Sequence, residues 1–319
     1  MQAQTPLWRR TPPAIFPVSL GFLGLGLAWR NAGAALGLPT EIGDFLLGAS
    51  TIFYLFFVAL FVLKLAARPG VLFEDLKTPP SRSGISAMAM AMILLPAVLL
   101  QFGLAWVWLW WIGVALHVVI ALLVARVMFA GAPETRSFTP FQYLTFVGLI
   151  VAPIAGVPLG QQAASFWLSM AAMVGFVIIT IGYGRKLTRV LPPPPLRPSL
   201  VITLAPVSLF GLMFAQYQAE IWFQAFYLLS WILALLLLIS ARWLLSAGWT
   251  PVWGALTFPI AAFTNLQIVA FTMGYGVVAL AGIWLGLTIG TPLILFVVIR
   301  AARAWSRGEL SKMSGAATA

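Results

Sequence analysis

The chain has 319 residues, of which 62% are hydrophobic and only 8% are charged, and its mean hydropathy is +1.02. Soluble proteins carry roughly a quarter of their residues as charged side chains, so this composition excludes a soluble enzyme and indicates many membrane-spanning helices. The net charge of +11 does not indicate a nucleic-acid partner, because the basic residues lie at the ends of apolar stretches, which is the pattern of membrane proteins.

Ten apolar stretches follow one another, and each is long enough to cross the hydrocarbon core of about 30 Å, which takes about 20 helical residues. They are 14–31, 42–67, 84–103, 105–129, 138–157, 160–186, 199–216, 218–245, 251–272 and 275–303. No cleavable signal peptide is expected, because the first stretch continues into a full span. We therefore expect an all-α integral membrane domain over 14–303, between cytoplasmic tails 1–13 and 304–319.

The basic residues are distributed unequally between the two ends of the spans. With ten spans, every Lys and Arg except Arg30 falls on the side of the two tails. The positive-inside rule then predicts cytoplasmic tails, and we expect the protein in a bacterial inner (plasma) membrane. The tryptophans Trp106, Trp108, Trp110 and Trp111 occupy the opposite border and are expected to form an interfacial belt.

Odd-numbered spans differ from even-numbered ones. Odd spans are short and contain the prolines at which helix kinks are expected, namely Pro17, Pro96, Pro153, Pro206 and Pro259. A proline inside a helix frees backbone polar groups that cannot face lipid, so these spans belong inside a bundle. Short links join each odd span to the next even one, and Pro17-Val18-Ser19-Leu20 recurs as Pro206-Val207-Ser208-Leu209. These patterns predict five parallel helical hairpins around a central pore, with the odd helices inside.

No group suited to catalysis or proton coupling is evident. The chain has no cysteine, and none of its seven acidic residues lies in the middle of a span. His117 is the only histidine, and we interpret it as an interhelical hydrogen-bonding residue rather than a proton relay. No metal site and no cofactor are expected. The Gly-rich segment 21–26 lacks the spacing of a dinucleotide fingerprint and is expected to serve close helix packing.

An anion pathway fits the odd spans better than a cation or proton pathway does. Their hydroxyls and amides can donate hydrogen bonds to a passing anion without holding it tightly. The candidates for this role are Ser19, Thr203, Ser208, Thr257, Thr264 and Asn265. The alternative for each residue is a hydrogen bond to a carbonyl of its own helix at a kink. In span 251–272, Phe258 precedes Pro259 and could obstruct a central cavity, although most of the 23 phenylalanines must pack or face lipid.

The chain resembles the TehA tellurite-resistance and dicarboxylate-transporter family, which includes the plant slow-type anion channels. The resemblance rests on the ten spans and on local motifs: Phe16-Pro17 with the Gly-rich run to Ala28-Trp29, the segment 198–206, and Trp253 to Thr257-Phe258-Pro259. It implies a homotrimer in which each protomer has its own pore, lined by the five odd helices and closed by a phenylalanine. By motif position this phenylalanine is Phe258, with Phe263 as the alternative. The tails are too short for kinase-regulated domains, so regulation by phosphorylation is not expected.

The sequence thus predicts a passive channel for small anions in contact with membrane lipid. The resemblance suggests chloride, nitrate, malate or tellurite as the permeating anion. The main alternative is an alternating-access carrier of dicarboxylates or tellurite oxyanion that uses His117. A membrane enzyme or a scaffold without transport is a third interpretation, which lacks any visible catalytic group.

Overall fold

The computed structural model describes residues 6–319, without the side chains of Pro133 and Glu134, and these residues form helices and no strands. The α-helices are α1 Phe16–Leu36, α2 Glu41–Ala67, α3 Val71–Asp75, α4 Pro79–Leu100, α5 Val107–Ala130, α6 Gln142–Phe146, α7 Ala152–Gly156, α8 Gln162–Leu187, α9 Leu204–Gln216, α10 Glu220–Ile239, α11 Ala241–Leu244, α12 Gly254–Thr272, α13 Gly276–Ser306 and α14 Glu309–Ser314. The 3-10 helices are η1 Leu7–Arg10, η2 Pro13–Ile15, η3 Pro133–Arg136, η4 Gly148–Val151, η5 Pro194–Thr203 and η6 Pro251–Trp253.

Nine helical stretches within the described residues are long and apolar enough to cross a membrane. The expected span 138–157 is not a continuous helix, because it is divided into α6, η4 and α7. Pro153 is the second residue of α7, where its missing N–H does no harm. In an uninterrupted helix its ring would clash with the carbonyl of Leu149. The chain therefore crosses this region in a broken form.

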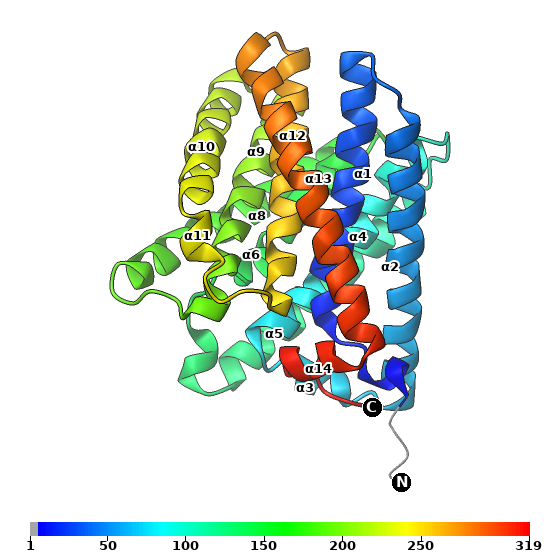
Figure 1. Cartoon of the computed structure of the whole chain (residues 1–319), viewed down its shortest axis with the longest axis vertical. Coiled ribbons are helices and arrows are strands. Elements are labelled where there is room, and N and C mark those ends of the chain that lie inside the picture. The colour runs from blue at the N-terminus through cyan, green and yellow to red at the C-terminus, as the bar shows by residue number, and fades with distance from the viewer. Residues whose placement is uncertain (1–5) are drawn as a thin grey trace.

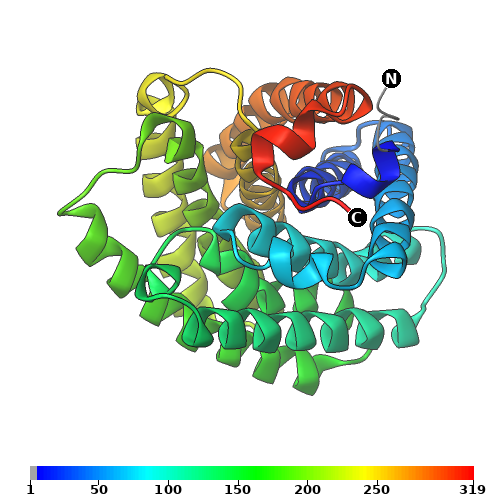
Figure 2. The same cartoon turned by 90° about the horizontal axis from the view of Figure 1, so that it is seen from below.

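The membrane-spanning elements fall into two classes that differ in burial. In the most apolar windows of α1, α4, α9 with η5, and α12, between 72% and 83% of the residues are buried. For α2, α5, α8, α10 and α13 the range is only 22% to 44%. Most residues of the broken segment α6–η4–α7 are also buried. We call the first four elements and the broken segment the inner elements, and the other five the outer helices (Figures 1 and 2).

Contacts between neighbours follow the same division. The inner elements α1, α4, α7, α9 and α12 each pack against the outer helix that follows them in the chain. The inner elements also touch one another in a closed series: α1 contacts α4, α4 contacts the broken segment, η4 contacts α9, α9 contacts α12, and α12 contacts α1. The inner elements thus share one interior, which the outer helices surround in part.

Three of the prolines expected to kink the inner helices begin them instead. Pro17 and Pro153 are the second residues of α1 and α7, and Pro206 is the third residue of α9. Each follows a 3-10 segment, so the helix changes type there rather than bending at an interior proline. Only Pro96 and Pro259, of the five, lie inside an α-helix. The difference arises because the fixed φ of proline suits the first helical turn.

Both ends of the described chain lie at the same end of the molecule (Figure 1). The backbone N–H of Ala319 donates a hydrogen bond to the carbonyl of Arg9, at 3.0 Å. This arrangement agrees with an even number of crossings in which the broken segment counts as one. Helix α14 and the residues after it run across this end of the molecule (Figure 2).

Candidate ion pathway

A cavity of about 350 Å³ lies between the inner elements. Every inner element contributes to its wall, including Leu20 of α1, Met90 of α4, Gly148 of η4, Leu209 of α9 and Phe258 of α12. The remaining lining comes largely from segments at the end that holds both chain ends, among them Pro80, Leu196, Thr250, Pro251 and Met313. The cavity is therefore a vestibule at that end, with mostly apolar walls and a few hydroxyl groups.

Phe258 borders this vestibule, whereas Phe263 does not. Phe258 is 7% exposed, and its ring lies against Gly24 of α1, where an added Cβ would stand 3.3 Å from Phe258 Cδ2. Phe263 makes an edge-to-face contact with Trp231 of α10, with ring centroids 5.3 Å apart. It lines a separate apolar cavity between α10, α12 and α13. Of the two phenylalanines considered from the sequence, Phe258 is the one that borders the vestibule.

Close packing of α12 on α1 fixes the place of Phe258. Thr257 Oγ1 lies 3.0 Å from the carbonyl oxygen of Pro17 and 2.8 Å from that of Gly254. A Cβ on Gly21 would come within 2.0 Å of Thr257 Oγ1 and 2.7 Å of the Phe258 backbone nitrogen. Only glycine at position 21 lets the two backbones approach this closely. The expectation that the Gly-rich segment serves helix packing is confirmed.

The six polar residues proposed to line the pathway do not border the cavity. Ser19, Ser208 and Thr264 donate to the carbonyl four residues earlier, at 2.8 to 3.2 Å, and Thr203 and Thr257 donate to the carbonyl three residues earlier. Asn265 Nδ2 lies 2.9 Å from the carbonyl of Ala261 and 3.3 Å from that of Gly24. With their donors engaged in this way, the geometry favours the alternative role in helix packing.

The repeated motif has the same structure in both places. Ser19 and Ser208 each stand two residues after a proline and donate to the residue two before it, Ile15 and Leu204 respectively. Pro17 and Leu20, like Pro206 and Leu209, line the cavity. The two segments therefore make equivalent contributions to the wall of the vestibule.

Two side chains of α5 hold the broken segment. His117 is fully buried, and its Nε2 lies 3.0 Å from the carbonyl oxygen of Thr145. Since a carbonyl oxygen can only accept, the proton is on Nε2. Trp110 Nε1 donates to the carbonyl of Ala152, also at 3.0 Å. The two donors stand seven residues apart, two turns of one helix face, and satisfy carbonyls near the break.

Trp110 was expected in an interfacial belt, and that expectation is wrong. It is fully buried, whereas Trp106, Trp108 and Trp111 are 41%, 57% and 45% exposed. His117, in contrast, has the interhelical hydrogen bond that we favoured for it. Trp110 and His117 are spaced to share one face of α5, and the segment they contact contains glycine and proline. This spacing is the feature of the sequence that could have indicated their role as donors to the broken segment.

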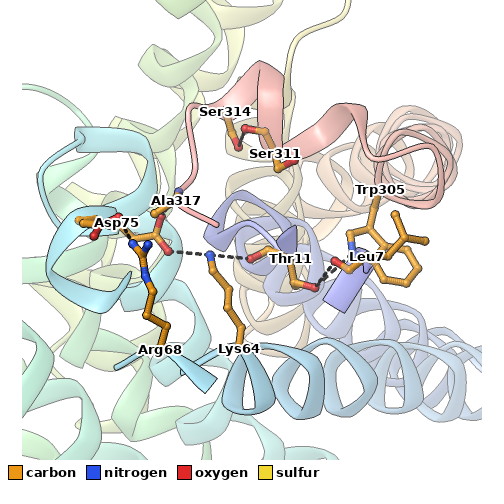
Figure 3. A network of polar contacts seen from close by, with 10 residues as sticks. Leu7, Thr11, Lys64, Arg68, Asp75, Trp305, Ser311, Ser314 and Ala317 are labelled. Atoms are coloured by element: carbon orange, nitrogen blue, oxygen red, sulfur yellow. Dashed lines mark hydrogen bonds and ion pairs between the residues drawn. The ribbon is translucent and has the colours of Figure 1, made fainter. Parts of the chain in front are cut away.

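A buried ion pair at the vestibule end was not anticipated from the sequence. Lys64 Nζ lies 2.9 Å from Asp75 Oδ2, and both side chains are fully buried. Lys64 also donates to the carbonyl of Thr11, and the N–H of Ala317 donates to Asp75 Oδ1 at 2.8 Å (Figure 3). Burial raises the pKa of Asp75, while the Lys64 charge opposes that rise. The sequence alone does not distinguish Lys64 and Asp75 from the exposed charged residues of an ordinary loop, so the pair could not be predicted from it.

At the opposite end, the isolated basic residue Arg30 is neutralised. Its Nε lies 2.8 Å from Asp44 Oδ1, in the first turn of α2. The one basic residue that the count placed at this end therefore has an acidic partner, while the other basic residues lie in the segments assigned to the end that holds the vestibule.

Residues 10–304 match the family model SLAC1, which is described as a voltage-dependent anion channel. The match covers most of the chain, from η1 into the last turn of α13, and so includes all the inner elements but not α14. No curated protein sequence matches the chain at a significant level.

Proposed function

The chain belongs to the SLAC1 family of voltage-dependent anion channels, and on this premise we propose that it is a passive anion channel whose path runs through the vestibule. This family includes TehA and the plant slow anion channels, so the resemblance drawn from the sequence is confirmed. The observation that carries the proposal is the wall of the cavity: all five inner elements contribute to it, and α12 contributes Phe258. We propose that Phe258 is the obstruction that keeps the path closed.

The architecture that we propose is a ring of five helical hairpins, each made of an inner element and the outer helix that follows it. The closed series of contacts among the inner elements supports this arrangement, as does the higher burial of the inner class. The broken segment α6–η4–α7 with α8 is the third hairpin. An irregular backbone inside a membrane protein is tolerated where it lines a cavity, and Gly148 and Ile150 line this one.

The chemistry of the lining favours small anions with weak binding. No carboxylate is among the side chains that line the vestibule within the described residues, so the wall has no fixed negative charge that would select cations over anions. The basic residues near the vestibule raise the local concentration of anions. Apolar walls with few hydroxyls bind an anion weakly, which allows it to leave as well as to enter. Chloride and nitrate suit such a path, and the resemblance adds malate and tellurite.

Location and assembly follow from the charge pattern and the resemblance. The basic end with both chain ends is assigned to the cytoplasm of a bacterial cell, and the spans to its inner membrane. The resemblance implies a homotrimer with one pore in each protomer. Its interfaces would lie on the outer helices, which expose large apolar side chains such as Ile221, Leu228 and Val277.

Electrical recording on Phe258→Ala tests the proposal. With the ring removed, we expect the current under a chloride or nitrate gradient to rise several-fold, and the reversal potential to follow the anion gradient. Phe263→Ala is the matched control, because it removes the same ring from the same helix on the side facing Trp231. The control should leave the current unchanged.

Two results would count against the channel. If neither variant conducts while liposomes exchange malate with saturable kinetics, the protein is a carrier. If both variants conduct equally, the effect comes from loosened packing of α12, and Phe258 is not the obstruction.

A further inference from the structure

The last described residues cover the mouth of the vestibule. Helix α14 and the segment after it cross the vestibule end in front of α1 and α12 (Figure 2). Met313 and Ser314 of α14 form part of the cavity wall. Leu310 and Ser311 are buried, at 1% and 6% exposed, so the helix is seated in the protein rather than lying free on its surface. Helix α14 is thus one of the segments that border the vestibule at this end.

The chain turns sharply before α14. Gly308 separates α13 from α14. Its φ of +69° is in the left-handed region, which residues other than glycine rarely adopt. The Arg10 guanidinium packs against this turn, with Nη1 3.0 Å from the place of a Cβ on Gly308. Gly315 has φ +64° at the other end of α14. The short helix is thus bounded on both sides by glycines in the left-handed conformation.

Beyond α14 the segment is attached to the buried ion pair. The N–H of Ala317 donates to Asp75 Oδ1, while Asp75 Oδ2 pairs with Lys64 of α2 (Figure 3). A buried carboxylate needs a donor for each oxygen, and leaving one unmatched is costly. The ion pair therefore leaves Asp75 with an accepting oxygen that the segment fills when it is seated. A second attachment joins the N–H of Ala319 to the carbonyl of Arg9.

We infer that residues 309–319 form a lid that closes the vestibule mouth, turns about Gly308, and is held shut by the hydrogen bond from Ala317 to Asp75. The inference rests on the proposed function, since a lid affects transport only if the vestibule is the path. It places two closures in series, the lid at the mouth and Phe258 within. The current that Phe258→Ala passes should therefore rise further when the lid is also opened.

Access to the vestibule can be measured without any current. The chain has no cysteine, so Ala255→Cys in the cavity wall gives a single site for a charged, membrane-impermeant thiol reagent. In this background Ala317→Pro removes the N–H that donates a hydrogen bond to Asp75, and it leaves the Lys64–Asp75 ion pair in place. We expect the labelling rate from the vestibule end to rise several-fold, toward the rate of a chain lacking residues 309–319.

Matched controls separate an opened lid from a damaged protein. Thr318→Pro introduces proline one position later and keeps the Ala317 donor, so its labelling rate should stay at the starting value. A cysteine at Ala172, which is buried in α8 at 1% exposed, should stay unlabelled in every variant if the bundle is intact. Equal labelling of Ala255→Cys in the parent, in Ala317→Pro and in the deletion would overturn the lid.

The same variants distinguish failure of the lid from failure of the channel. If labelling rises and the current of Phe258→Ala rises further on adding Ala317→Pro, the lid and the path are both supported. If labelling rises but no variant conducts, the lid stands as a cover and the proposed path is wrong. If labelling does not change while Phe258→Ala conducts, the channel stands and the lid is overturned.

Discussion

At the scale of single residues, the position of Phe258 depends on what is missing from α1. Because Gly21 and Gly24 have no side chain, Thr257 and Phe258 can pack directly against the backbone of α1. In a membrane there is little hydrophobic drive to bring helices together, so close packing of small residues contributes much of the association. The glycines of α1 therefore set the position of the phenylalanine that we propose as the obstruction.

We expect Gly21→Ala to destabilise the protein. Its Cβ would lie 2.0 Å from Thr257 Oγ1 and 2.7 Å from the Phe258 nitrogen, so α1 and α12 must separate. Overpacking of this kind costs about 1–3 kcal/mol. Thermal unfolding in detergent should show a lower midpoint. Gly48→Ala is the control, since no atom lies within 4 Å of the place of its Cβ on α2, and it should be neutral or slightly stabilising. Equal midpoints for the two variants would contradict the packing argument.

At the scale of elements, the sequence predicted where the chain crosses the membrane better than how it does so. Apolar length indicated ten crossings, and nine described stretches are long enough as helices. Length and hydropathy cannot reveal the break in 138–157. A broken helix is stable in a membrane only where donors satisfy its carbonyls. Those donors are His117 and Trp110, which lie 28 and 42 residues from their acceptors.

We expect Trp110→Phe to weaken the attachment of the broken segment. Phenylalanine keeps most of the buried ring but has no N–H, so the carbonyl of Ala152 is left without that donor. An unsatisfied buried group costs about 1–3 kcal/mol, which should lower the thermal midpoint in detergent. Trp108→Phe is the control, because Trp108 is 57% exposed on the same helix. A midpoint that falls as much in Trp108→Phe as in Trp110→Phe would show that the Trp110 bond contributes no stability.

The candidate site was only partly visible in the sequence. Phe258 was selected because a proline follows it in an inner span, and it does border the cavity. The polar residues of the same spans were expected to face the path, yet their donors bind backbone carbonyls. Composition cannot separate these outcomes, because a serine two residues after a proline can turn toward the pore or toward its own helix. Neither could it show that the segment after α13 folds back over the vestibule.

At the scale of the whole molecule, charge and geometry agree on one orientation. Both ends of the described chain lie at the basic end, whose segments also line the vestibule, and Arg30 at the other end is paired with Asp44 (Figure 1). The positive-inside rule predicts that the vestibule faces the cytoplasm. The path would then collect anions from the cell interior, with the lid as the first barrier and Phe258 as the second.

Single cysteines in exposed loops test this orientation. Leu104 lies between α4 and α5 and is 42% exposed, and Val190 lies between α8 and η5 and is 64% exposed. An impermeant thiol reagent added to cells with a permeabilised outer membrane should label Leu104→Cys and spare Val190→Cys, because the two loops are on opposite sides. Inverted membrane vesicles should give the opposite pattern, and the cysteine-free parent should remain unlabelled in both. If Val190→Cys is labelled in cells instead, the vestibule faces outward, and the basic residues around it concentrate external anions rather than cytoplasmic ones.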